Sequence, residues 1–197
     1  MMNAQAKYFN EKASVWDSIS IVNPGKIEHI LDVADLNSGD RVLDVGTGTG
    51  VLIPYLLKRI GSKGNIDGVD ISEGMLDEAR KKFGAVKHVT LSQADAELDE
   101  FNRQYDRIIL YCVYPNLRHP MPTLQKLVRE NLRPGGTLLI AHPYGREHVN
   151  KHNGESHLGQ CDRLFPVADL LEEMENYGLQ ADYTEDNSAY YIVRIRK

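Results

Sequence analysis

Short apolar runs alternate with amphipathic segments along most of the chain. Residues 41–45 contain an apolar run closed by glycines, which is typical of a buried strand. Residues 51–60 place apolar side chains at helical spacing, and Pro54 falls in the first turn, where its missing N–H costs little. The same alternation predicts further strands at 65–70, 86–92, 105–113 and 137–141, and helices at 72–83, 121–132 and 167–177.

This alternation predicts the fold class. Strands joined by helices of about ten residues form right-handed βαβ units and a parallel sheet covered on both faces. The chain ends differently, because residues 179–184 and 189–195 flank a short turn at Asp186-Asn187 and must be antiparallel. We therefore predict an α/β fold: a doubly wound, Rossmann-like, mostly parallel seven-stranded sheet with an antiparallel C-terminal hairpin edge. Ser72 is expected to cap the second helix and Gly178 to end the last one.

Two segments do not follow the alternation. Residues 1–25 precede the first strand as an amphipathic helix and loop, and residues 142–165 form a polar, histidine-rich insertion. The apolar side of the first segment carries Tyr8, Phe9, Val15 and Trp16. Ligands of open α/β sheets bind beyond the carboxyl ends of the strands, so both segments are expected to form a lid there. The chain is expected to be one domain with four parts: 1–25, a core at 26–141, 142–165 and the final helix and hairpin at 166–197.

Composition and charge narrow the possible functions. The 197 residues include 23 Lys and Arg against 28 Asp and Glu, with no dense basic run, so a nucleic-acid partner is not expected. Two cysteines, neither in a C-x-x-C pattern, indicate a reducing compartment. No secretion signal is recognisable, and the apolar runs are far shorter than the roughly 20 residues that span a bilayer. We therefore expect a soluble, cytoplasmic protein without a membrane partner; its oligomeric state is left open.

A glycine-rich turn joins the first strand to the first helix. In Asp44-Val-Gly46-Thr-Gly48-Thr-Gly50 the glycines allow a tight turn and a close approach of backbone N–H groups to a ligand, or serve packing alone. Asp70 ends the next strand twenty residues after Gly50, where a carboxylate accepts hydrogen bonds from ribose hydroxyls. The spacing G-x-G-x-G differs from the dinucleotide pattern G-x-G-x-x-G, which disfavours a nicotinamide oxidoreductase. Asp44 favours a ligand with a positive end over a pyrophosphate.

Four motifs in this order resemble those of class I S-adenosylmethionine-dependent methyltransferases of the small-molecule type: VLDVGTGTG, GVDIS, ADA and LRPGGTL, within residues 26–141. The resemblance implies S-adenosylmethionine as cofactor and transfer of its methyl group to a small organic acceptor by in-line displacement. It implies cofactor contacts for ten residues: Asp44, Gly46, Gly48, Gly50, Asp70, Ile71, Met75, Asp95, Ala96 and Tyr111. Among these, Asp70 would bind the ribose, Ile71 and Met75 the adenine ring, and Asp95 the adenine amino group.

Several of these roles have a simpler alternative. Met75 is equally expected as a helix residue packed in the core. Asp95 could instead cap the turn that begins at Ala96. Cys112, in the apolar fourth strand, is expected to be a buried small hydrophobic residue.

The acceptor is expected to lie between the first segment, the end of the fourth strand and the insertion. Tyr8, Trp16 and Tyr114 are the candidate acceptor-binding residues. The chain lacks the Asn-Pro-Pro-Tyr or Asp-Pro-Pro-Tyr signature that marks methylation of base and glutamine amino groups in related enzymes. It has Val113-Tyr-Pro-Asn116 instead, which favours another small acceptor.

Four of the seven histidines fall in the insertion, at 142, 148, 152 and 157, and Cys161 follows them. His148 and His152 share one face if this stretch is helical. We expect at least one of His142, His148 and His152 to act on the acceptor as a base or orienting donor. A solvated polar loop, or a grip on a metal-containing ligand, is the alternative, and no resident metal is predicted. A non-catalytic module that binds S-adenosylmethionine, S-adenosylhomocysteine or a metal ligand is the alternative function.

Overall fold

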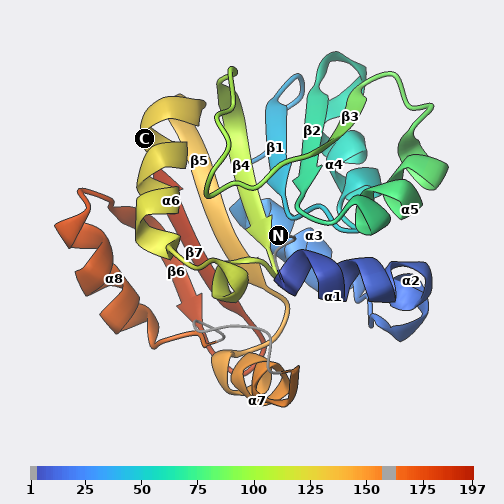
Figure 1. The fold of residues 1–197 in the computed structure, drawn as a ribbon. Helices are drawn as coiled ribbons and strands as arrows, with labels where there is room; N and C mark the ends of the chain where they lie inside the picture. The colour runs from blue at the N-terminus through green and yellow to red at the C-terminus, as the bar shows by residue number, and fades with distance from the viewer. Residues whose placement is uncertain (1–3, 157–162) are drawn as a thin grey trace.

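The computed structural model describes residues 4–156 and 163–197, and their centre is a seven-stranded sheet (Figure 1). The strand order is β3-β2-β1-β4-β5-β7-β6. The strands are β1 (Arg41–Val45), β2 (Asn65–Asp70), β3 (Val89–Gln93), β4 (Tyr105–Tyr111), β5 (Leu132–His142), β6 (Ala181–Asp186) and β7 (Tyr191–Arg196). Neighbours among β1 to β5 are parallel, whereas β7 runs antiparallel to both β5 and β6. The predicted fold class is confirmed.

Helices cover both faces of this sheet and its carboxyl edge (Figure 1). They are α1 (Ala4–Lys12), α2 (Trp16–Ile19), α3 (Pro24–Val33), α4 (Ile53–Ile60), α5 (Glu73–Phe83), α6 (Pro120–Lys126), α7 (Arg146–Ser156) and α8 (Val167–Asn176). Short helical turns are η1 (Ala13–Val15), η2 (Gly61–Lys63), η3 (Tyr114–Asn116) and η4 (Leu127–Asn131). No helix among the described residues is long and apolar enough to cross a bilayer.

Alternate side chains of the buried strands point into two hydrophobic clusters. In β1, Val42 packs with α3 and α4 on one face, whereas Leu43 packs with α6 and α8 on the other. This period of two follows from the pleat of a strand. Because both faces are covered, strands such as β4 read as continuous apolar runs.

Two expected helix boundaries are present. Ser72 Oγ accepts the N–H of Met75 at 3.2 Å and caps α5. Gly178 follows Tyr177, the C-cap of α8, and has a φ of 69°, a conformation that glycine adopts without steric cost. Both capping predictions are confirmed.

Three predicted boundaries differ most from the structure. The strand expected at 86–92 begins only at Val89, since the backbone around Val86 forms turns after α5. The helix expected to reach 132 leaves α-geometry after Lys126 and ends in η4. The strand expected at 137–141 begins at Leu132, because Gly135 and Gly136 pair with the backbone of Lys197, a contact that local sequence does not reveal.

Candidate active site

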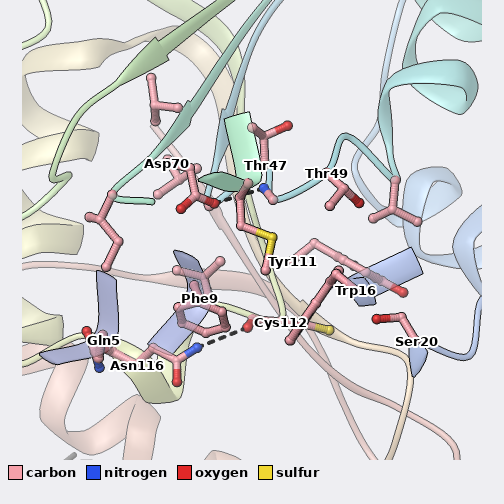
Figure 2. Close-up of a pocket in the computed structure, with 18 of the residues that line it drawn as sticks. Gln5, Phe9, Trp16, Ser20, Thr47, Thr49, Asp70, Tyr111, Cys112 and Asn116 are labelled. Atoms are coloured by element: carbon pink, nitrogen blue, oxygen red, sulfur yellow. Dashed lines mark hydrogen bonds between the residues drawn. The ribbon is translucent and has the colours of Figure 1, made fainter. Parts of the chain in front are cut away.

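A cavity of about 460 Å³ lies at the carboxyl ends of the parallel strands. This volume is within the range of small-molecule sites, roughly 300–1,000 Å³. Its wall combines the turns that follow β1 to β5 with residues 5–22, called the N-terminal segment below (Figure 2). The cavity therefore lies at the edge of the sheet where the site was predicted, and the N-terminal segment contributes to its wall.

The glycine turn forms the floor of the cavity. Gly46 has a φ of 67°, and a Cβ atom there would lie 2.3 Å from Cγ2 of Val113, so no larger residue fits. Gly46 and Gly48 line the cavity. Gly50 does not; it packs against Phe83 and serves the helix rather than the cavity wall.

Two buried carboxylates, Asp44 and Asp70, lie beside this turn. Asp70 accepts the N–H groups of Gly48 at 2.9 Å and Ser72 at 2.8 Å, while Asp44 accepts the hydroxyl of Thr47 at 2.7 Å. Among the residues that the structure describes, neither forms an ion pair with a Lys, Arg or His side chain. Burial, with the charge of Asp70, raises the pKa of Asp44 to about 7. Burial also raises the pKa of Asp70. Asp70 lines the cavity, whereas Asp44 does not belong to the lining and is bonded to Thr47 of the turn.

The predicted adenine contacts gather at one end of the cavity. Ile71, Met75, Asp95 and Ala96 all belong to its wall, and Met75 is also packed into the start of α5. The two expectations for Asp95 are compatible: its Oδ1 accepts the N–H of Glu97 at 2.9 Å, so it caps that turn, and its side chain also lines the cavity. Its Oδ2 pairs with Arg118 at 3.0 Å.

The end of β4 forms a further part of the wall. Tyr111 lines the cavity, as predicted for a residue near the methyl group. Cys112 is not the buried strand residue that was expected: β4 ends before it, and its side chain is exposed in the cavity wall (Figure 2). Its φ of 59° is costly for a residue with a Cβ atom. Tyr114 is buried in the core and does not belong to the lining.

Side-chain hydrogen bonds hold the N-terminal segment over the cavity. Oδ1 of Asn10 accepts the N–H of Gly74 at 2.8 Å. Asp17 accepts the hydroxyl of Thr49 at 2.5 Å and pairs with Lys82 at 2.8 Å. These bonds join the segment to α5 and to the glycine turn itself.

Aromatic rings give this segment its inner surface. Phe9 and Trp16 line the cavity and meet edge to face, with ring centroids 5.6 Å apart. Tyr8 packs on the other side of Phe9 at 5.4 Å and does not line the cavity. Of the three predicted acceptor contacts, the cavity wall includes Trp16 but neither Tyr8 nor Tyr114.

The three candidate histidines have separate positions. His148 lies on α7 in the cavity wall, where its ring stacks on Tyr144 at 4.4 Å. His142 is buried at the end of β5 against Tyr191, outside the cavity lining, and burial lowers its pKa to about 3. It is therefore neutral and does not face the cavity. The backbone of His152 belongs to α7, as the helical prediction requires, but its side chain lies outside what the structure describes. His157 and Cys161 lie outside the described residues.

Some lining residues were not predicted. Tyr144 lies two residues after the end of β5. Lys26 holds it in place, because its ammonium lies 4.6 Å from the Tyr144 ring and donates to the carbonyl of Pro143 at 2.6 Å. An aromatic residue at the carboxyl end of a central strand was the signal that could have identified Tyr144. No group of three or more His, Cys, Asp or Glu side chains suited to a metal ion occurs in the described part of the chain.

Comparison with known proteins matches this geometry. A family profile described as "Methyltransferase domain" covers residues 42–136, which include the glycine turn, Asp70 and Asp95. A malonyl-[acyl-carrier protein] O-methyltransferase of Priestia megaterium is 31% identical over 170 residues, with 84% of this chain and 61% of that protein covered. The chain belongs to the class I S-adenosylmethionine-dependent methyltransferases.

Two further methyltransferases illustrate the similarity. A ubiquinone/menaquinone biosynthesis C-methyltransferase UbiE of Pseudomonas paraeruginosa is 29% identical over 144 residues, with 68% of this chain and 56% of that protein covered. A solved methyltransferase structure from Aquifex aeolicus shares the fold with a TM-score of 0.70 at 22% identity, covering 96% and 97% of the two chains. The chain thus spans about three-fifths of the length of these two curated methyltransferase relatives.

Proposed function

We propose that this protein transfers the methyl group of S-adenosylmethionine to a small organic acceptor by in-line displacement. The observation that carries the proposal is the pair Asp44 and Asp70. Two buried carboxylates with raised pKa values lie beside a backbone cradle, without a cationic side-chain partner in the described structure. A ligand with a positive end would supply the missing charge.

The cavity fits this cofactor better than a dinucleotide. No Lys or Arg belongs to its lining, as far as the structure describes the chain, so a pyrophosphate would find only backbone donors. At Gly48, which lines the cavity, a Cβ atom would meet no described atom beyond its chain neighbours nearer than the Gly46 carbonyl oxygen at 4.0 Å, so the backbone of the turn is open to a ligand there. S-adenosylmethionine supplies, when bound, a methyl group on a cationic sulfur with a good leaving group.

The chain's own residues would bind and orient. Asp70 can accept ribose hydroxyls with the lone pairs that the Gly48 and Ser72 amides leave available. Ile71 and Met75 would pack on the adenine ring and Asp95 would accept from its amino group. Gly46, Gly48 and Asp44 would hold the amino-acid end, with Gly50 supporting the turn from behind.

The acceptor side needs alignment and exclusion of water more than it needs a nucleophile. Phe9 and Trp16 would exclude water, and Tyr111 would border the methyl group. We propose His148 as the base or orienting donor, supported by its place in the cavity wall and its stacking on Tyr144. His142 has no path to the acceptor in this arrangement.

We also propose that residues 1–25 act as a lid on a single catalytic domain. The bonds of Asn10 and Asp17 to α5 and the glycine turn support this role, because they close over the cofactor side of the cavity. The excess of acidic over basic residues supports an acceptor other than nucleic acid, and the cysteine usage supports a cytoplasmic location.

Isothermal titration with S-adenosylmethionine, S-adenosylhomocysteine and NAD tests the proposed cofactor. The first two should bind and NAD should not; binding of NAD alone would overturn the proposal. Turnover against a panel of phenols, amines, carboxylic acids and thiols then separates an enzyme from a module that binds without reaction.

The role of His148 is tested by His148→Gln with Glu147→Gln as the matched control, since Glu147 lies next to it on α7 outside the cavity wall. Cofactor affinity should stay unchanged in both variants. Turnover should fall at least tenfold in His148→Gln only. Equal turnover in both variants would remove His148 from the mechanism.

A further inference from the structure

Exposed apolar side chains gather at the mouth of the cavity. Six large hydrophobic residues are exposed among the described residues, and four of them, Val15, Ile19, Ile21 and Val22, fall within eight positions of the N-terminal segment. Ile21 is 82% exposed. Exposed hydrophobic residues scattered singly are ordinary, but a contiguous group marks a contact surface.

Three of these residues belong to the cavity as well as to the outer surface. Ile19, Ile21 and Val22 are part of the cavity wall and are at the same time exposed. The apolar lining therefore continues from Trp16 inside the cavity to Ile21 outside it. Such continuity distinguishes a path for a bound molecule from an isolated patch on the surface.

The segment that carries this path is bonded to its surroundings through Asp17, and the capped helix α3 follows it directly. Asp17 bonds to Thr49 and Lys82, and the side chain of Asn23 caps α3 by accepting the N–H of Lys26. The exposed isoleucines are thus presented from a segment that is bonded to the cofactor-binding elements. This placement argues for an occupant that extends out of the cavity.

The charge of the wall limits the chemistry of that occupant. No Lys or Arg side chain lines the cavity within the described residues. The lining carboxylates of Asp17, Asp95 and Glu97 are paired with Lys82 or Arg118, whereas that of Asp70, beside the glycine turn, has no such partner in the described structure. An anionic group would gain nothing from this wall. Aromatic and aliphatic groups of a ligand would bury apolar surface against Trp16 and the exposed isoleucines, which favours binding.

We propose that the methyl acceptor carries an apolar chain that leaves the cavity across Ile19, Ile21 and Val22. The reacting end would lie inside, near Tyr111 and His148, and the chain would cover the exposed side chains at the mouth. This inference rests on the proposed methyl transfer for the identity of the inner end, and it adds the class of acceptor: a small molecule with an uncharged apolar tail.

The test is a series of 4-alkylphenols, from 4-methylphenol to 4-hexylphenol, titrated into protein saturated with S-adenosylhomocysteine. Each added methylene should tighten binding about two- to fourfold while it covers apolar surface at the mouth. In the double variant Ile19→Ser/Ile21→Ser the gain per methylene should fall below about 1.5-fold. Leu98→Ser is the matched control, because Leu98 is 71% exposed and does not line the cavity.

Two readouts keep the outcomes separate. Affinity for S-adenosylhomocysteine should be equal in all three proteins, which also reports that each is folded; failure of the unaltered protein to bind it would overturn the proposed function itself. With that binding intact, equal alkyl gains in the unaltered protein and the double variant would overturn the tail site. The tail site would also be overturned if affinity did not change along the alkyl series and the unaltered protein instead sedimented with phosphatidylcholine vesicles or dimerised. If the double variant lost the vesicle binding, the patch would be assigned to a lipid surface. If it lost the dimerisation, the patch would be assigned to a second copy of the chain.

Discussion

The substitution Asp44→Asn removes one charge from the buried carboxylate pair and leaves an oxygen that can still accept the hydroxyl of Thr47. In the folded protein, burial and the charge of Asp70 raise the pKa of Asp44 from 3.8 to about 7. Because the folded state binds this proton more tightly than the unfolded chain, the ionised group lowers the free energy of unfolding. This loss of stability is absent below about pH 4. It grows as the pH rises from the pKa of Asp44 in the unfolded chain to its pKa in the folded protein, and it is complete above about pH 7.

The size of this effect follows from the shift. One pKa unit corresponds to about 1.4 kcal/mol, so a shift of about three units costs about 4 kcal/mol of stability at pH 8. The asparagine amide brings two buried donors that a carboxylate lacks, which costs about 1–3 kcal/mol. We therefore expect Asp44→Asn to raise the free energy of unfolding at pH 8 by about 1–3 kcal/mol. At pH 5 the native carboxyl is already protonated, so the variant should be no more stable than the unaltered protein.

Urea denaturation of the ligand-free protein at pH 5 and pH 8 measures this difference. Asp67→Asn is the matched control, because Asp67 is a buried carboxylate on the neighbouring β2 whose partners are the hydroxyl of Tyr105 and the guanidinium of Arg103. The control should be destabilised at both pH values, since it loses an ion pair. Equal destabilisation of Asp44→Asn at pH 5 and pH 8 would refute the reasoning. It would show that the ionised Asp44 carboxylate does not destabilise the folded protein.

Four further outcomes are expected. Asp70→Asn, which keeps one acceptor for the turn, should weaken binding of S-adenosylmethionine about tenfold by calorimetry, and unchanged affinity would place Asp70 outside the cofactor site. Asp17→Asn should speed hydrogen exchange of residues 5–20 in the free protein, and cofactor with acceptor should slow it; equal protection throughout would make the segment a permanent part of the core. Gly46→Ala should lower the free energy of unfolding by at least about 1–3 kcal/mol in urea, because the new Cβ atom meets Val113; a silent change would show that the turn adapts. Turnover of His148→Gln should fall while cofactor binding persists.

Local features were predictable from sequence because their causes are local. The run 41–45, the glycines after it and the cap at Ser72 determine a strand, a turn and a helix within a few residues. The place of Asp70 follows from the rule that parallel strands end at one edge of the sheet. Both expectations for Asp95 were compatible because one carboxylate can cap a turn and face a cavity.

The remaining features depend on partners far away in sequence. Asp17 and Thr49 are 32 positions apart in the sequence, and Asn10 and Gly74 are 64 apart, so no local sequence pattern predicts these hydrogen bonds. His142 was expected at the cavity because it ends β5, but the antiparallel strand β7 brings Tyr191 against it and buries it. The ligand roles of the candidate residues and the division of the chain into lid, core and insertion stay predictions.

Proton release on binding of S-adenosylmethionine tests most directly whether a cationic ligand completes the pair of Asp44 and Asp70. Titrations at pH 6.5 in two buffers of different ionisation enthalpy give the number of protons released per bound molecule. With a pKa of about 7 for Asp44 in the free protein, which the positive ligand lowers, about 0.8 proton should leave on binding, and none in Asp44→Asn. Absence of binding, or binding with the same proton release in both proteins, would contradict the account.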